Sequence, residues 1–172
     1  MSKADDATNR PGIIGPADPT NTVLQRAGHR DCVIASVATA LQLTYEKVAE
    51  MFEIRLGNNG DPLVGDGINL LDTFGVIFKR GWSACPLIAA EHPAVDNAEI
   101  THLSSDEIKN ALEGHLAVVG YVDADPETGQ HVLAWDGCNA IDCSNGTIVS
   151  LEDVIIDLAV VLTRAAPLAP TE

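Results

Sequence analysis

The sequence predicts an α+β domain in which helices come early in the chain and an antiparallel sheet follows. Apolar residues recur at helical spacing over 33–52, whereas short apolar runs bounded by turn residues dominate after residue 115. The 172 residues suit one domain with a sizeable core, and 46% hydrophobic against 20% charged residues exclude a disordered chain. We expect a flexible N-terminal arm over 1–20, one domain over 21–165 and a C-terminal tail over 166–172.

Three longer helices are expected. The stretch 33–43 is rich in Ala, Val and Leu, and Asp31 precedes it at the position of a helix cap. A second helix over 44–52 places its apolar residues on one face. A third begins at Ser104 or Ser105, has acidic residues in its first turn, and ends at the next glycine.

The β signals are short, mostly apolar runs, and we expect strands at 76–82, 116–122, 131–135, 138–143 and 158–164. Short helices are expected at 68–74 and after Ser150. The pair Asp136-Gly137 is typical of a two-residue type I′ hairpin turn, which pairs Trp135 with Cys138.

The charge balance excludes several function classes. Ten Lys and Arg face 25 Asp and Glu, giving a net charge of −15, so the chain has no electrostatic reason to bind nucleic acid or an anionic membrane. After residue 80 the only cations are Lys109 and Arg164, against 15 acidic residues. This asymmetry suits a solvated acidic surface or a cationic partner.

Nothing in the sequence indicates export or a cofactor. The start MSKADDATNRPG lacks the apolar stretch of a signal peptide, and no apolar run approaches the ~20 residues that span a bilayer. The four cysteines lack the CxxC spacing of zinc and redox sites. We therefore expect a cytoplasmic protein with free thiols, no metal and no cofactor.

Cys32 follows a polar loop and begins an apolar helix. The positive end of the helix macrodipole favours a thiolate there, and the thiolate is the nucleophile in thiol catalysis. By position alone, a small buried structural cysteine is the commoner case.

The position of His131 favours a catalytic role for Cys32 over a structural one. Continuing the pairing of Trp135 with Cys138 along both strands places Asp142 opposite His131, on the same face. A carboxylate there can hold one imidazole nitrogen and leave the other for a nucleophile. The alternative is a hairpin with one surface ion pair, which leaves the context of Cys32 unconnected.

An acyl-transfer site also needs donors for the oxyanion. The backbone N–H of Cys32 is one, and the side-chain amide of Gln25, seven positions upstream, is a second unless it is simply exposed. His29 and Trp135 are candidates for substrate contact, with a loop or core role as the alternative for each.

Three segments together resemble the papain-like cysteine peptidases, especially compact bacterial members related to the double-glycine leader peptidases. LQRAGHRDCVIASVATALQLTYEKVAE is similar to the nucleophile segment, and GQHVLAWDGCNAIDCSNG is similar to the histidine–aspartate hairpin. Between them, SSDEIKNALEGHLAVVGYVD is similar to the helix and strand that precede the catalytic histidine. The resemblance spans roughly residues 22–164. It departs from the family in the glutamine spacing, usually six, and in the residues that follow Cys32 and Asp142.

The resemblance implies a nucleophile helix packed on an antiparallel sheet, with Cys32 as nucleophile, His131 as general base and acid, Asp142 as orienter and Gln25 as oxyanion donor. It implies a thiol hydrolase, a peptidase or isopeptidase that forms an acyl-enzyme, from a bacterium or phage. The substrate would be a peptide or protein, and the acidic half of the chain favours a basic one. The alternatives are an acyltransferase or transglutaminase-like enzyme on the same scaffold, and a non-catalytic binding protein with an acidic partner-binding surface.

Overall fold

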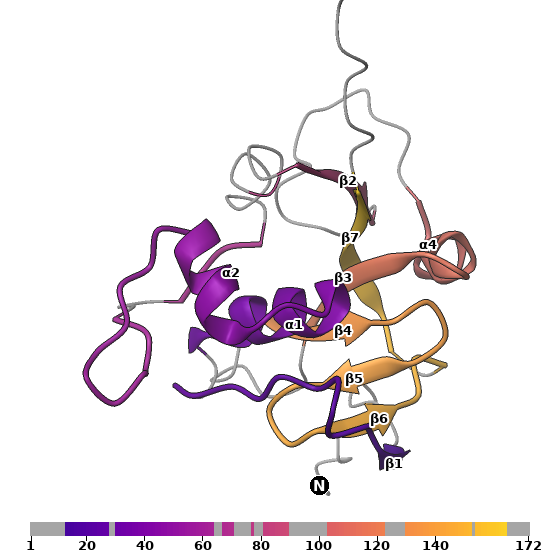
Figure 1. Ribbon diagram of the computed structural model, residues 1–172. Coiled ribbons are helices and arrows are strands. Elements are labelled where there is room, and N and C mark those ends of the chain that lie inside the picture. Colours follow the sequence, from indigo (N-terminus) through magenta and orange to yellow (C-terminus); the bar gives the residue numbers. More distant parts are fainter. Residues whose placement is uncertain are drawn as a thin grey trace, which may run out of the picture.

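The computed structural model describes residues 13–27, 30–63, 67–70, 77, 81–89, 103–122, 130–152 and 154–164. Its strands form one seven-stranded sheet with the order β1-β6-β5-β4-β3-β7-β2, in which every pairing is antiparallel (Figure 1). The strands are β1 Ile13–Pro16, β2 Trp82–Ile88, β3 Leu116–Val122, β4 Gln130–Trp135, β5 Ala140–Asp142, β6 Thr147–Val149 and β7 Ile156–Arg164. The α+β class with an antiparallel sheet is thus confirmed.

Helix α1 (Cys32–Leu41) packs on β4 and β3, and every one of its ten residues is buried. It lies in front of the central strands in Figure 1, with α2 (Tyr45–Met51) against its outer side. The core on this side of the sheet is built from small and branched residues, as the scarcity of aromatic residues requires. Because each buried aliphatic side chain contributes about 1.5–3 kcal/mol, this face supplies much of the driving force for folding.

Helix α4 (Ser105–Leu112) covers the opposite face, where Ile108 and Leu112 pack on β3 and β7. Its start is a capping box: the Ser104 hydroxyl accepts from the Glu107 backbone N–H, and the Glu107 carboxylate accepts from the Ser104 backbone N–H. The sheet is therefore covered on both faces. No helix in the described part of the chain is long and apolar enough to cross a bilayer.

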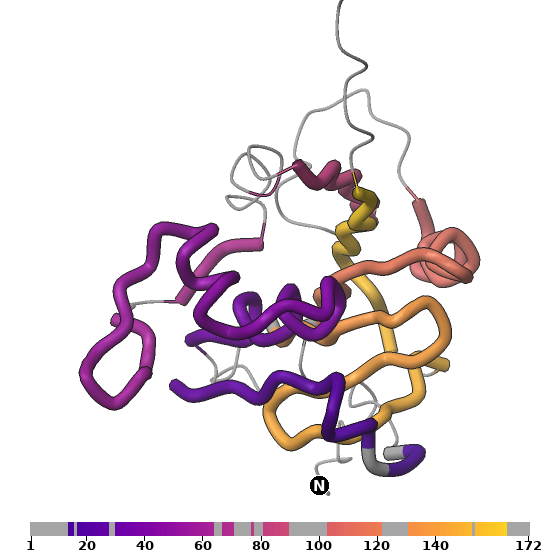
Figure 2. The backbone as a smooth tube through the Cα atoms, in the orientation of Figure 1, coloured from indigo at the N-terminus to yellow at the C-terminus, as the bar shows by residue number. Residues whose placement is uncertain are grey.

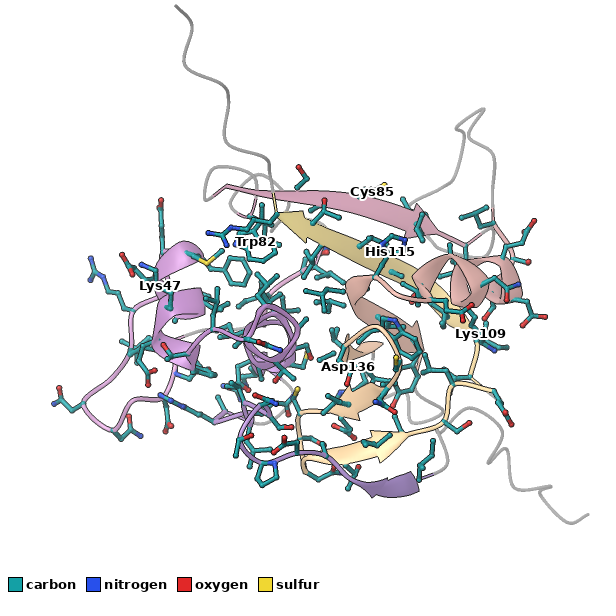
Figure 3. All side chains as sticks on the ribbon, turned by 45° about the vertical axis from the view of Figure 1, so that its right-hand side comes forward. Lys47, Trp82, Cys85, Lys109, His115 and Asp136 are labelled. Carbon is teal, nitrogen blue, oxygen red and sulfur yellow. The ribbon has the colours of Figure 1, made fainter. Side chains whose placement is uncertain are left out.

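The connection between β4 and β5 differs from the expected two-residue turn. Trp135 pairs with Ala140, not with Cys138, so four residues form the loop. The Asp136 carboxylate accepts from the backbone N–H groups of Cys138 and Asn139, which closes the wider turn (Asp136 is labelled in Figure 3). Side-chain hydrogen bonds of Asp commonly compete with regular turns in this way, so the dipeptide rule was wrong here.

Other expectations fail at the edges of the sheet. Residues 13–16, assigned to a loose arm, form β1 on β6. Of the strand expected at 76–82, residues 76 and 78–80 lie outside the described residues, 77 and 81 are not in a strand, and β2 begins only at Trp82 and runs to Ile88. The described residues after Ser150 do not form the expected helix. Directly before Ser150 lies strand β6, which the sequence did not predict. Most of 68–74, and the tail 166–172, lie outside the described residues.

Replacing Ser104 by Ala tests the cap of α4. We expect the free energy of unfolding to fall by about 1 kcal/mol, because the Glu107 N–H loses its acceptor and the capping box is broken. Urea unfolding followed by circular dichroism measures this, with Ser83→Ala on β2 as a control outside any cap. An unchanged midpoint for Ser104→Ala would contradict the assignment.

Candidate active site

Cys32 is the first residue of α1 and is 7% exposed. One turn further, the Ser36 hydroxyl donates to the Val132 carbonyl oxygen at 3.1 Å, so the helix is hydrogen-bonded to β4 next to His131. A serine hydroxyl buried in an apolar helix face needs such an acceptor. The bond therefore fixes the start of α1 against the start of β4.

His131 and Asp142 are hydrogen-bonded to one another. His131 Nε2 lies 3.1 Å from Asp142 Oδ1, and both side chains are largely buried. The Tyr121 ring meets the imidazole edge to face, with centroids 5.8 Å apart. The histidine is thus held by a carboxylate on one edge and an aromatic ring on its flank, and its other nitrogen, Nδ1, is buried.

The two residues meet diagonally across the hairpin, not directly opposite one another. Because the loop is two residues longer than expected, the partner of each β4 position moves by two along the chain. Side chains alternate between faces with a period of two, so such a shift leaves Asp142 on the same face as His131.

The Asp142 carboxylate favours its ionised form. Burial alone would raise its pKa, but hydrogen bonds from His131 and from Ser144 outweigh burial and hold the pKa below its usual value of 3.8. A charged carboxylate at this position stabilises a protonated imidazole.

The Cys32 thiol has the opposite tendency to the one expected from its helix position. Burial raises its pKa to about 11; hydrogen bonding with the Val33 backbone lowers the pKa, and the charge of Asp31 raises it further. Desolvation therefore outweighs the helix terminus, and the resting thiol is neutral near pH 7.

No hydrogen bond joins the Cys32 thiol to the His131 ring among the described residues. The Cys32 helix is linked to this strand by the hydrogen bond from Ser36 to Val132, one residue after the histidine. Catalytic hydrogen bonds are often long in unliganded enzymes and shorten when substrate binds. The structure thus brings His131 and Asp142 together and places the start of the Cys32 helix beside their strand.

Gln25 is held beside the same hairpin. Its backbone N–H donates to the Cys143 carbonyl oxygen at 2.9 Å, directly after Asp142. In Figure 2 this indigo segment runs beside the β5–β6 connection before the chain reaches α1. The side-chain nitrogen Nε2 is buried and has no hydrogen-bond partner among the residues that the structure describes. An unsatisfied buried donor is costly, and a ligand oxygen would satisfy it.

Asp31 does not cap α1 with its side chain, contrary to expectation. The carboxylate is fully buried and turns back toward the preceding loop, where Oδ2 accepts from the backbone N–H groups of Arg26 and Ala27 and from the Tyr45 hydroxyl. Its position directly before Cys32 was the only sequence signal of this role, and that position suits a cap equally well.

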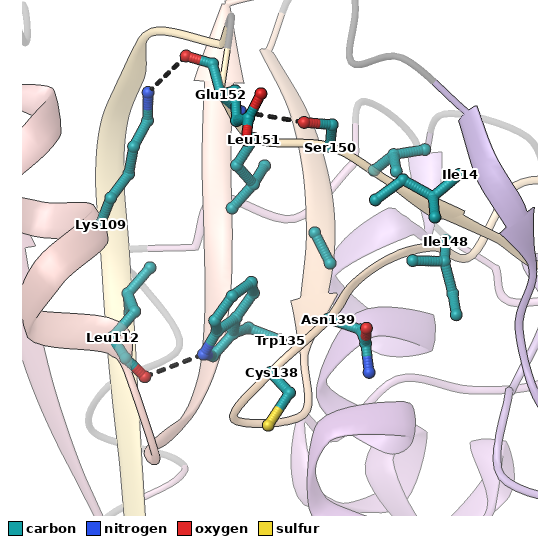
Figure 4. Close-up of a pocket in the computed structure, with 12 residues that line it drawn as sticks. Ile14, Lys109, Leu112, Trp135, Cys138, Asn139, Ile148, Ser150, Leu151 and Glu152 are labelled. Carbon is teal, nitrogen blue, oxygen red and sulfur yellow. Dashed lines mark hydrogen bonds between the residues drawn. The ribbon is translucent and has the colours of Figure 1, made fainter.

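The two residues expected to contact substrate are His29 and Trp135, and the structure describes only the second. His29 lies outside the described residues. Trp135 lies at the other end of β4 from His131, where its indole N–H donates to the Leu112 carbonyl oxygen at 2.8 Å. There it lines a mostly apolar hollow of about 320 Å³ between α4 and β5–β6 (Figure 4). A substrate contact by Trp135 stays a prediction.

The chain is similar in fold to the peptidase domain of Streptococcus ComA, described as a bifunctional ABC transporter involved in a quorum-sensing pathway. The two are 18% identical, the match covers 84% of this chain and 98% of that domain, and the TM-score is 0.46. No protein-family model and no curated protein sequence matches the chain.

The Asp142→Asn variant tests the His131–Asp142 pair through its pH dependence. The folded pKa of Asp142 is depressed, so its contribution to stability is present above the unfolded value near 3.8 and is lost as pH falls through the folded value. We expect Asp142→Asn to be less stable than the wild type near pH 6, and the gap to shrink below pH 4. Urea unfolding at several pH values measures this.

The control for this experiment is the His131→Gln background. There the cost of Asp142→Asn should be smaller, because one partner of the bond is already gone. A gap between wild type and Asp142→Asn that is constant from pH 3 to 7 would contradict the pairing.

Proposed function

We propose that this chain is a thiol hydrolase of the cysteine peptidase type, with Cys32 as nucleophile, His131 as general base and acid, and Asp142 as its orienter. The observation that carries the proposal is the buried hydrogen bond between His131 Nε2 and Asp142 Oδ1, next to the strand residue to which the Cys32 helix is bonded. The carboxylate occupies Nε2, so Nδ1 is the nitrogen that would exchange a proton with the thiol.

The reaction would proceed through an acyl-enzyme. His131 Nδ1 takes the Cys32 proton as the sulfur attacks the substrate carbonyl carbon, and Asp142 stabilises the imidazolium. The tetrahedral intermediate collapses, the carbon–nitrogen bond breaks, and the amine leaves with the proton from His131. Water, deprotonated by His131, then attacks the thioester, and the Cys32 sulfur leaves and regains its proton.

The raised pKa of Cys32 favours a proton transfer that accompanies the attack on the carbonyl carbon. A thiol that is neutral in the resting protein requires a general base in the acylation step, so loss of His131 would slow acylation directly. The backbone N–H of Cys32 and the buried amide of Gln25 would stabilise the oxyanion.

The substrate class follows from the same scaffold and from charge. We propose a peptide or protein substrate, and favour a basic one because the net charge of −15 attracts cations at low ionic strength. No cofactor is needed for this chemistry.

A second candidate is a non-catalytic binding protein on a papain-like scaffold. It is favoured by the neutral, buried Cys32 thiol. An acyltransferase on the same site is the third candidate, because the fold does not decide whether water or an amine accepts the acyl group.

An ester probe separates these candidates. We expect N-acetylglycine p-nitrophenyl ester to acylate Cys32 in a Cys85→Ala/Cys138→Ala background, which removes the two exposed thiols. Stopped-flow release of nitrophenolate, with mass spectrometry of the acyl-enzyme, gives the rate. His131→Gln should lower that rate by about 10²–10⁴-fold, because the general base is lost, and Asp142→Asn should lower it less.

The control is Cys32→Ala, which should release nitrophenolate only at the background rate. Equal acylation of the wild type and His131→Gln would leave the binding protein as the better account. Adding glycinamide tests the third candidate: an N-acetylglycyl amide product in excess of the hydrolysis product would indicate acyl transfer.

A further inference from the structure

We infer that Asp31 is a positioning residue of this site: its buried carboxylate binds the backbone at Arg26 and Ala27 and thereby holds the Gln25 amide where it can donate a hydrogen bond to the oxyanion. The inference rests on the proposed function, and it assigns to Asp31 a role that acts through Gln25 and not on the substrate.

The hydrogen bonds of the carboxylate carry the first step. Asp31 is fully buried, and its Oδ2 accepts from Arg26 N at 2.7 Å and from Ala27 N at 3.2 Å. Hydrogen bonds to an ionised carboxylate are about twice as strong as neutral ones. The backbone directly after Gln25 is therefore tied to the residue before Cys32.

Gln25 is fixed from its other side as well. Its backbone N–H donates to the Cys143 carbonyl oxygen, so the glutamine lies between the end of β5 and the Asp31 carboxylate. With the main chain held on both sides, the buried Nε2 has little freedom to find another acceptor. Preorganised donors of this kind need no rearrangement when the oxyanion forms.

Helix α2 provides a further donor to the Asp31 carboxylate. The Tyr45 hydroxyl donates to Asp31 Oδ2 at 2.7 Å, and the Arg26 guanidinium lies 4.1 Å from the centre of the Tyr45 ring while it pairs with Glu46. Burial and the hydrogen bond to Asp31 both raise the pKa of Tyr45, so it stays a donor. Arg26 is thus held at its backbone by Asp31 and at its side chain by α2.

A double-mutant cycle on ester acylation tests the inference, with Asp31→Asn, Gln25→Ala and the double variant in the Cys85→Ala/Cys138→Ala background. Gln25→Ala should slow acylation by N-acetylglycine p-nitrophenyl ester on the order of 10²-fold. Asp31→Asn should slow it at least tenfold, and the double variant should stay within about twofold of Gln25→Ala alone. Losses that multiply, or an Asp31→Asn rate within twofold of the wild type, would overturn the inference.

Alkylation by iodoacetamide at fixed pH provides a readout that structural damage alone would not reproduce. It forms no oxyanion, and the Asp31 charge disfavours the thiolate, so Asp31→Asn should alkylate Cys32 at least as fast as the wild type while it acylates more slowly. Slowing of both reactions would indicate general damage and overturn the inference. Asp106→Asn, which removes an exposed carboxylate on α4, should change neither rate.

Tyr45→Phe is the second variant, because it removes one donor to Asp31 and keeps the charge and the ring. If Asp31→Asn does not fold, Tyr45→Phe and its double variant with Gln25→Ala take its place in the cycle. Tyr45→Phe should then slow acylation less than expected for Asp31→Asn, and the double variant should again acylate about as fast as Gln25→Ala alone. Absence of Cys32 acylation in the wild type would overturn the proposed function, and the positioning role with it. Acylation that depends on His131 but not on Asp31 or Tyr45 would overturn the positioning role alone.

Discussion

The complete burial of α1 between the sheet and α2 is the constraint on which the rest of the structure depends. A ten-residue helix with no exposed face must satisfy its polar side chains within the protein. Ser36 does so on the Val132 carbonyl, and Thr39 does so with the Val23 backbone and the Cys143 thiol. These bonds set the position of the helix along β4 and β5, and with it the distance between Cys32 and the hairpin.

The same burial determines the electrostatics of the site. Asp142, Asp31 and Cys32 are ionisable groups within or beside the core, and each is accommodated differently. Hydrogen bonds with His131 and Ser144 hold the pKa of Asp142 down despite burial. Asp31 is held by two backbone N–H groups and Tyr45. For Cys32, burial outweighs the backbone hydrogen bonds and favours the neutral thiol. The net charge of −15 contributes little to this balance, because distant surface charges are screened within ~8–10 Å at ordinary salt.

The β4–β5 hairpin explains why the sequence predicted the contact between His131 and Asp142 correctly although the predicted turn was wrong. The dipeptide Asp136-Gly137 predicted a two-residue turn, while the Asp136 carboxylate closes a four-residue one. The error moved each partner by two positions, which preserves the face of the sheet. An error of one residue would have placed Asp142 on the opposite face, out of reach of His131. Sequence reasoning identified Cys32, His131, Asp142 and Gln25 as candidates, and their catalytic roles stay predictions.

The sequence by itself determined the features that depend on near neighbours in the chain: the α+β class, the capping box of α4, the strand at 116–122 and the order of the candidate residues. Only the tertiary structure decided that Asp31 turns away from the helix it precedes, that β1 and β6 extend the sheet, and that Cys32 is neutral. The reason is physical. Caps, periodicity and turns involve groups a few residues apart, whereas burial and long-range hydrogen bonds depend on which distant segments pack together. For Cys32, the local helix terminus and the surrounding core act in opposite directions, and the core prevails.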